Sequence, residues 1–143
     1  MPVTHIGSQW VQGVLQFFRK SDGEIVFSIS PNGIGRKVTR VDVDNQNAAL
    51  PASTLAAGLL VHTSASAGGT LTVDTGANLD AAFPEWQVGE VRECYYVNDG
   101  NQTVTLTGAT GAARVAATTI ATLQGARICF LKTAAETYSV WAV

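Results

Sequence analysis

The chain has 143 residues, of which 46% are hydrophobic and only 14% are charged, with a formal net charge of −2. This length and apolar content predict one folded domain with a real core, and they exclude a chain disordered by composition. The weak negative charge argues against nucleic-acid binding, and the scarcity of charge leads us to expect part of the surface to be buried against other subunits.

Residues 1–48 predict an N-terminal β-hairpin arm followed by a linker. In "GVLQFFRKSDGEIVFSIS" (13–30) two apolar runs flank Ser21-Asp22-Gly23, a pattern typical of a hairpin in which glycine supplies the positive φ. The sequence then indicates a turn at 31–35, a strand at 36–44, and a polar, proline-containing linker at 45–53. We therefore place the domain boundary after residue 48.

The charges are unevenly distributed along the chain. Residues 1–40 contain five basic and two acidic side chains, whereas residues 41–91 contain six acidic side chains and no lysine or arginine. A basic arm that docks on an acidic neighbour is one interpretation. Ordinary variation among few charges is the other, and the sequence favours it.

Residues 49–143 predict an antiparallel β-sandwich of jelly-roll type. Short runs of β-branched and aromatic residues recur about every 8–12 residues between Gly, Asn, Asp and Pro, a spacing typical of all-β folds. The sequence also predicts a tight apolar turn, with room for one helical turn, at 79–84. The strands are expected at 55–64, 68–76, 89–99, 102–108, 113–122, 126–133 and 137–143.

Side-chain alternation assigns two faces to the later strands. Val91, Glu93, Tyr95 and Val97 share one face of the strand at 89–99, and Arg92, Cys94 and Tyr96 share the other. Tyr138, Val140 and Ala142 share a face of the last strand, opposite Ser139, Trp141 and Val143. Cys94 and Cys129 lie within strands and are expected to be buried free thiols, although a bridge between neighbouring strands stays open. We expect no export signal after Met1, and no membrane partner because no 18-residue apolar run exists.

A search for chemistry leads us to expect no catalytic, metal-binding or cofactor-binding residue. Asp42 and Asp44 share a strand face and are interpreted as solvated rather than as cation ligands, and His62 as a strand-end histidine rather than a general base. "GATGAAR" (108–114) is expected to be a β-turn because a strand, not a helix, follows it. The chain is therefore predicted not to be an enzyme, and a small hydrolase that uses Asp42 or Asp44 is the least favoured alternative.

Aromatic side chains offer a second kind of site. A platform for a sugar ring would draw on Trp10, Trp86, Trp141, Tyr95 and Tyr96. On strands such residues more often fill a core or a subunit interface, and we favour that interpretation.

Several phrases resemble a β-domain of tailed-bacteriophage structural proteins. They are "Ala-Phe-Pro…Val-Gly-Glu" (82–90), "Val-Asn-Asp-Gly-Asn" (97–101), "Thr-Val-Thr-Leu-Thr-Gly-Ala-Thr-Gly" (103–111) and "Thr-Ile-Ala" (119–121). The stretch "GSQWVQGVLQFFRKSDGEIVFSIS" (7–30) is similar to the N-terminal hairpin of capsid decoration (cement or head-fibre) proteins. The family also includes parts of tail fibres, so a tail-fibre or tail-spike module that binds host-surface glycans is the alternative.

The resemblance implies a structural virion protein, made in the host cytoplasm, that binds the major capsid protein as a homotrimer on the capsid surface without a cofactor. Core packing of the hairpin is an equal alternative for the aromatic residues in the expected contact set. That set comprises Trp10, Phe17, Phe18, Arg19, Lys20, Arg36 and Lys37.

Overall fold

A computed structural model describes the backbone of residues 6–11, 14–19, 25–30 and 33–36, and describes residues 38–63, 69–116 and 119–143 with their side chains. The chain divides into two compact units, Met1–Val38 and Thr39–Val143. The second unit thus begins ten residues before the boundary expected at residue 48, because the segments that follow Val38 pair as strands within it.

The first unit contains one antiparallel sheet. Its strands are β1 (Ile6–Val11), β2 (Val14–Arg19), β3 (Ile25–Ser30) and β4 (Gly33–Arg36), in that order. The pairing of β2 with β3 confirms the predicted hairpin strands, and its turn at Ser21-Asp22-Gly23 lies outside the described residues. Two flanking strands that the sequence did not predict extend this hairpin into a sheet.

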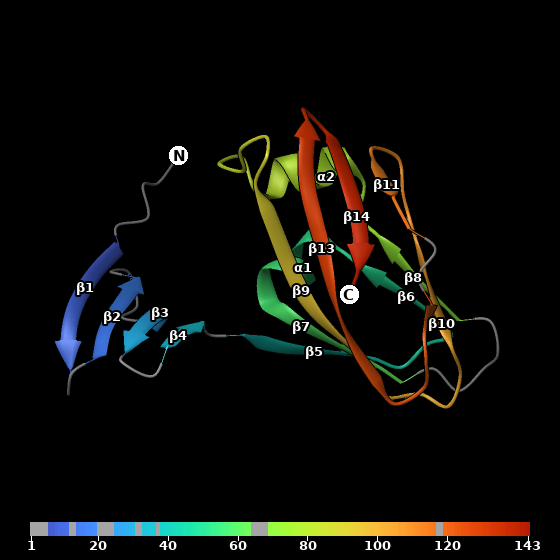
Figure 1. Ribbon diagram of the computed structural model, residues 1–143, viewed down its shortest axis with the longest axis horizontal. Coiled ribbons are helices and arrows are strands. Elements are labelled where there is room, and N and C mark those ends of the chain that lie inside the picture. The colour runs from blue at the N-terminus through green and yellow to red at the C-terminus, as the bar shows by residue number, and fades with distance from the viewer. Residues whose placement is uncertain are drawn as a thin grey trace. The chain divides into compact units, whose positions relative to one another are not determined.

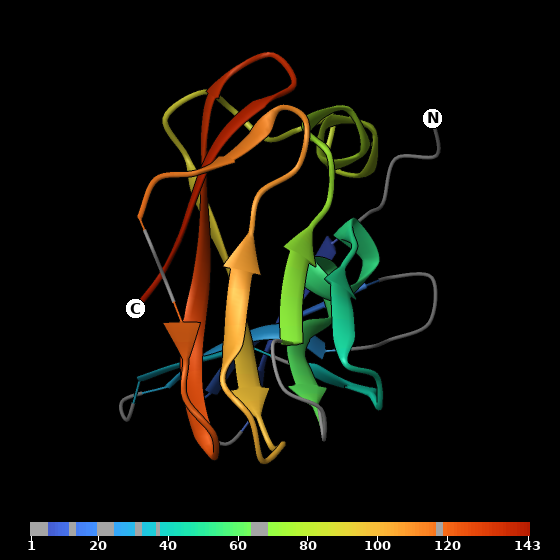
Figure 2. The same cartoon turned by 90° about the vertical axis from the view of Figure 1, so that its right-hand side faces the viewer.

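The second unit contains two sheets and two short helices (Figure 1). The six-stranded sheet has the order β11 (Ala112–Arg114), β14 (Thr137–Ala142), β13 (Gln124–Ala134), β9 (Val91–Asn98), β7 (Gly58–His62), β5 (Thr39–Val43). The four-stranded sheet has the order β12 (Thr119–Ile120), β10 (Val104–Thr107), β8 (Gly69–Val73), β6 (Asn47–Leu50), and Figure 2 shows these strands side by side. The helices are α1 (Ala52–Ala57) and α2 (Gly76–Ala82).

The chain passes from one sheet to the other after almost every strand. From β5 to β13, successive strands fall alternately in the six-stranded and the four-stranded sheet. From β5 to β10 the neighbours within a sheet are therefore next-but-one in sequence, and β5–β7, β7–β9, β6–β8 and β8–β10 all pair in parallel. The all-β prediction is confirmed, but the antiparallel prediction is wrong for these sheets, which are mixed. The turns between successive strands carry the chain from one sheet to the other, whereas hairpins within one sheet were expected.

Both sheets contribute side chains to one hydrophobic core. Leu71 and Leu106 from the four-stranded sheet and Tyr96, Ile128 and Phe130 from the six-stranded sheet are fully buried in the same cluster. Trp86, on the loop before β9, joins them and packs 4.8 Å from the ring of Tyr138, centroid to centroid. Alternate residues of each strand thus face this core, as strand periodicity requires.

Four segments differ from their predicted structure. The turn predicted at 31–35 overlaps β4, and the strand predicted at 113–122 is divided into β11 and β12, which belong to different sheets. The segment predicted as a linker contains β6, in which Ala48 and Leu50 are buried while Asn47 and Ala49 are exposed. This alternation of buried and exposed residues spans only four positions in a polar segment, so the sequence did not predict it. The strand predicted at 55–64 is instead α1 followed by β7, which does end at His62. The helix forms after Pro51, where the carboxylate of Asp74 accepts a 3.0 Å hydrogen bond from the backbone N–H of Ala52.

Candidate interaction surface

The six-stranded sheet has a second face, opposite the core, which we call the outer face. It is formed by the alternate residues that the core does not use, together with the terminal Val143, whose backbone continues the pairing of β14. Its central members are Leu59 and Val61 on β7, Val91, Glu93, Tyr95 and Val97 on β9, Arg127, Cys129 and Leu131 on β13, and Ser139, Trp141 and Val143 at the end of the chain.

The outer face is apolar and partly open to solvent. Val91 is 52% exposed, Tyr95 45% and Val143 64%. On the same face, Val61 and Cys129 are each only 6% exposed. Where one face of a sheet lies in solvent, the strands normally carry polar residues at the alternate positions on that face. On β9 and β13, by contrast, both faces carry apolar residues.

Arg127 occupies the middle of the outer face. It lies opposite Tyr95 in the register with β9, and its backbone N–H and C=O bond to Val143 on the other side, at 2.7 and 3.0 Å. The Arg127 guanidinium also lies 3.5 Å from the carboxylate of Glu93. These two opposite charges keep the centre of the face electrically neutral.

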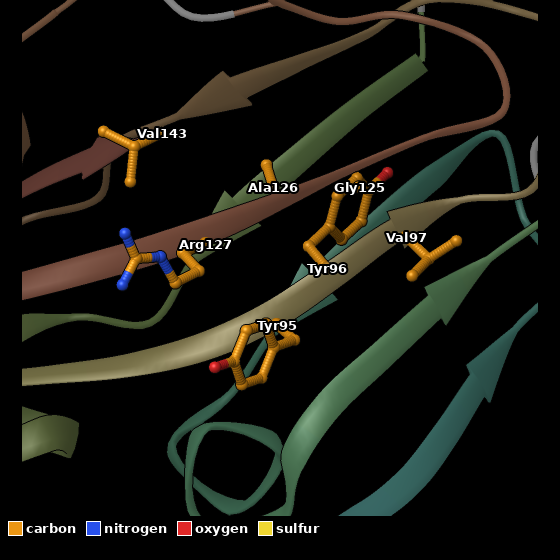
Figure 3. A pocket seen from close by; sticks show the side chains of 7 residues that line it. All are labelled: Tyr95, Tyr96, Val97, Gly125, Ala126, Arg127 and Val143. Carbon is orange, nitrogen blue, oxygen red and sulfur yellow. The ribbon is translucent and has the colours of Figure 1, made fainter.

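A hollow of about 370 Å³ opens beside Tyr95 and Arg127 (Figure 3). Gly125 lies opposite Val97 in the register and has no side chain to fill the space above it. Tyr95 and Tyr96 leave β9 on opposite sides, and Arg127 lies between Tyr95 and Val143 in the close-up view. The hollow is lined by Tyr95, Tyr96, Val97, Gly125, Ala126, Arg127 and Val143.

Both cysteines are buried, and neither forms a disulfide. Cys94 faces the core and Cys129 lies on the outer face, so the two thiols are on opposite sides of the sheet. Burial, with the negative charge of Glu93, raises the pKa of the Cys129 thiol. Cys129 is therefore a neutral, apolar member of the outer face rather than a reactive thiolate.

The predicted capsid-contact residues fall in the first unit. Trp10 is in β1, Arg36 in β4, and Phe17, Phe18 and Arg19 in β2, while Lys20 and Lys37 lie outside the described residues. The strand register places Phe17 opposite Phe27, which in turn lies opposite Arg36. One sheet thus collects the five described positions, and Phe17 and Arg36 fall in one cross-strand row.

The aromatic platform proposed for a sugar ring does not form as a set. Trp86 is 2% exposed and Tyr96 is fully buried, because both fill the core, so neither can contact a ligand. Burial also raises the pKa of Tyr96. Of the described members, Tyr95 and the half-buried Trp141 remain accessible, both on the outer face.

The polar candidates are engaged in structural contacts. Asp42 lies 2.6 Å from Arg40, with both side chains 60% exposed, which confirms the solvated strand face. His62 is fully buried: the Tyr96 hydroxyl donates to its Nδ1 over 2.7 Å, and its Nε2 donates to the carbonyl of Asn45. Both ring nitrogens are occupied, in keeping with a strand-end histidine. In residues 38–63, 69–116 and 119–143, no group of three or more His, Cys, Asp and Glu side chains could hold a metal ion.

The glycine-containing segment at 108–114 forms the predicted β-turn. The N–H of Ala112 donates to the carbonyl of Ala109 over 2.9 Å, and Gly111 has a φ of +73°. Strand β11 follows directly. This turn has a packing role, because the backbone of Glu136 lies directly against Gly111.

Arg127, Gly125 and Val143 did not emerge from the sequence as site residues. A signal was nevertheless present: "ARICFL" (126–131) is almost continuously apolar, as strands covered on both faces are. What single-sequence reasoning could not supply was the register, which brings Arg127 beside Tyr95 from a strand some thirty residues away.

Neither helix within the described ranges is long and apolar enough to cross a membrane. Comparisons of the chain with protein-family models, with curated proteins and with solved structures give no match in any of the three.

Proposed function

We propose that the chain is a structural protein of a bacteriophage virion, a capsid decoration or cement protein that binds the assembled shell as a homotrimer and stabilises it. The observation that carries the proposal is the division of the chain into two compact units. A separate four-stranded sheet bears the expected contact residues, and a larger unit has its own core and an unpartnered apolar face.

The charges of the two units support different partners. Residues 1–38 contain four basic and two acidic side chains, whereas residues 39–143 contain five basic and nine acidic ones. The first unit is therefore suited to an acidic patch on the major capsid protein. The net negative charge of the second unit suits a surface that faces solvent.

The mechanism of such a protein is mass action rather than catalysis. A ligand that binds the assembled shell and not its dissociated subunits stabilises the shell by its binding free energy at the prevailing concentration. Three linked copies strengthen the effect, since the second and third contacts form at a high effective concentration. Weak single contacts through the first unit then suffice for firm attachment.

Deletion of residues 1–38 tests the assignment, because unit 2 has a complete core and shares no strand pairing with unit 1. The full chain should co-sediment with expanded shells purified from the virus that encodes it. The deleted chain should keep its oligomeric state and lose shell binding. Undiminished binding by the deleted chain would contradict the role of the first unit, and no binding by the full chain would contradict the function itself.

A glycan-binding tail module is the alternative. Tyr95 and Trp141 are the accessible aromatic residues among those described that would serve it, and Arg127 and Glu93 beside Tyr95 would supply hydrogen bonds to a sugar. Saturable binding of a host polysaccharide that is lost in Tyr95→Ala would favour this alternative over the capsid assignment.

A further inference from the structure

We infer that the outer face is the contact between copies of this chain, with Tyr95 of one copy inserted into the hollow above Gly125 of the next. The inference deepens the proposed function, because it names the surface through which the proposed trimer forms. It stands on the shape, chemistry and size of the outer face.

The shapes match. Tyr95 projects from the face with 45% of its surface exposed, and the adjoining hollow measures about 370 Å³. A cavity of roughly 150 Å³ already holds a benzene ring, so the hollow has room for a phenol ring. Tyrosine is among the residues that most often anchor interfaces by filling such pockets.

The chemistry of the hollow matches the same side chain. Val97 and Val143 provide apolar walls, and Arg127 provides guanidinium N–H donors at one side. A buried tyrosine needs an apolar surround for its ring and a hydrogen-bond partner for its hydroxyl. The phenol oxygen of an inserted Tyr95 can accept from Arg127, while the pairing of Arg127 with Glu93 leaves no net charge to repel an identical face.

The size of the face suits a contact between copies. Four strands about 4.8 Å apart and a β9 of eight residues give a footprint of roughly 500 Å². Two such faces together bury about 1,000 Å², which is the least that a specific interface usually buries. Tyr95 and the hollow lie side by side on one face, so each copy presents both the inserted side chain and the space that receives it.

Two substitutions test the contact from its two sides in the full chain. Tyr95→Ala removes the side chain that is inserted, and Gly125→Leu fills the hollow that receives it. The backbone at 125 accepts a Cβ within one copy, because that atom meets only the carbonyl oxygen of Tyr96, at 3.5 Å. Each variant should weaken self-association by at least about 30-fold, measured by sedimentation equilibrium, with unchanged circular dichroism.

Two matched controls separate this effect from a general loss of apolar surface. Val88→Ala trims another exposed side chain, 63% exposed, on a loop outside the sheet, and Gly125→Ala adds a methyl group too small to fill the hollow. Both controls should associate like the unchanged chain.

Mixing the two disrupted variants gives the sharpest result. Tyr95→Ala removes one wall of the hollow but leaves the space above Gly125 open, and Gly125→Leu keeps Tyr95, so one contact can form between them and a ring cannot close. The mixture should yield a two-copy species that neither variant forms alone.

The inference is overturned if the unchanged chain is monomeric at micromolar concentration, or if either variant associates normally. If the chain is monomeric and Tyr95→Ala instead loses shell binding, the face belongs to the capsid and not to a second copy. Failure of the proposed function would appear separately, as self-association without shell binding.

Discussion

The Nζ atom of Lys132 lies 2.8 Å from Oδ1 of Asp80, and both side chains are largely enclosed, at 10% and 23% exposure. Asp80 belongs to α2 and Lys132 to β13, so the pair joins the helix to the six-stranded sheet. The hydroxyl of Tyr138 and the backbone N–H of Glu136 also donate to the same carboxylate. This cluster holds the end of the β13–β14 hairpin against α2.

Replacement of Asp80 by asparagine should destabilise the fold by about 2 kcal/mol, because it leaves a buried lysine without its charge partner. Urea unfolding followed by circular dichroism measures the effect. Asp42→Asn is the matched control: its ion pair with Arg40 is as short, at 2.6 Å, but both side chains are 60% exposed. The control should change stability little, since exposed pairs are screened by solvent. Equal effects of the two substitutions would contradict the role assigned to Lys132 and Asp80.

The same cluster predicts an acid-dependent loss of stability. Hydrogen bonds from Lys132, Tyr138 and the backbone of Glu136 lower the pKa of Asp80 from 3.8 to about 2. The contribution of Asp80 is therefore complete above about pH 4 and is lost as the pH falls through about 2. The difference in unfolding free energy between the unchanged chain and Asp80→Asn should shrink across this window. A difference that is constant from pH 5 to pH 2 would show that the carboxylate does not titrate with this lowered pKa.

Asp74 links the two helices through their first turns. Its carboxylate accepts from the backbone N–H groups of Ala52 and Thr75 and from the side chain of Asn78. Burial raises the pKa of Asp74, but these hydrogen bonds outweigh burial and lower it. Asp74→Ala should cost about 1 to 2 kcal/mol of stability, the usual effect of losing a helix cap. Asp44→Ala, at an exposed position just beyond β5, is the control and should leave the melting temperature unchanged.

Glycine at position 111 is required by both conformation and space. Its φ is +73°, and a Cβ there would lie 2.3 Å from the carbonyl oxygen of Glu136. Gly89 has a similar φ of +90° but no atom within 4 Å of the same position. Gly89→Ala should therefore cost about 1 kcal/mol from backbone strain alone, and Gly111→Ala about 3 kcal/mol or more because the chain must also move. Thermal unfolding of the two variants side by side checks this order, and the reverse order would show that the close approach at 111 is relieved cheaply.

The sequence predicted the positions of most strands but not how they pair. The alternation around Tyr95 and Tyr96 correctly separated a buried face from an open one, because strand periodicity is a local property. The strands predicted at 89–99 and 102–108 were expected in one antiparallel arrangement, yet β9 and β10 belong to different sheets. Turn residues show that the chain changes direction, and only tertiary packing decides whether it returns to the same sheet.

The candidate site was less predictable than the strands, because tertiary packing decides which residues come together in it. Tyr95 and Trp141 were identified as aromatic candidates, and the structure leaves both accessible on one face. Trp86 was an equally good candidate by sequence, but it is enclosed by the core. The hollow at Gly125 depends on a missing side chain beside a strand distant in sequence, a feature that no local pattern reports.

The measurement that tests the central claim most directly is an electron cryomicroscopy reconstruction of expanded shells from the encoding virus after incubation with the full chain. Our account predicts added density on the outside of the shell at three-fold or quasi-three-fold positions. Each position should hold three copies, with the outer faces of their six-stranded sheets turned toward one another. Shells that carry no added density, or density from single separate copies, would contradict it.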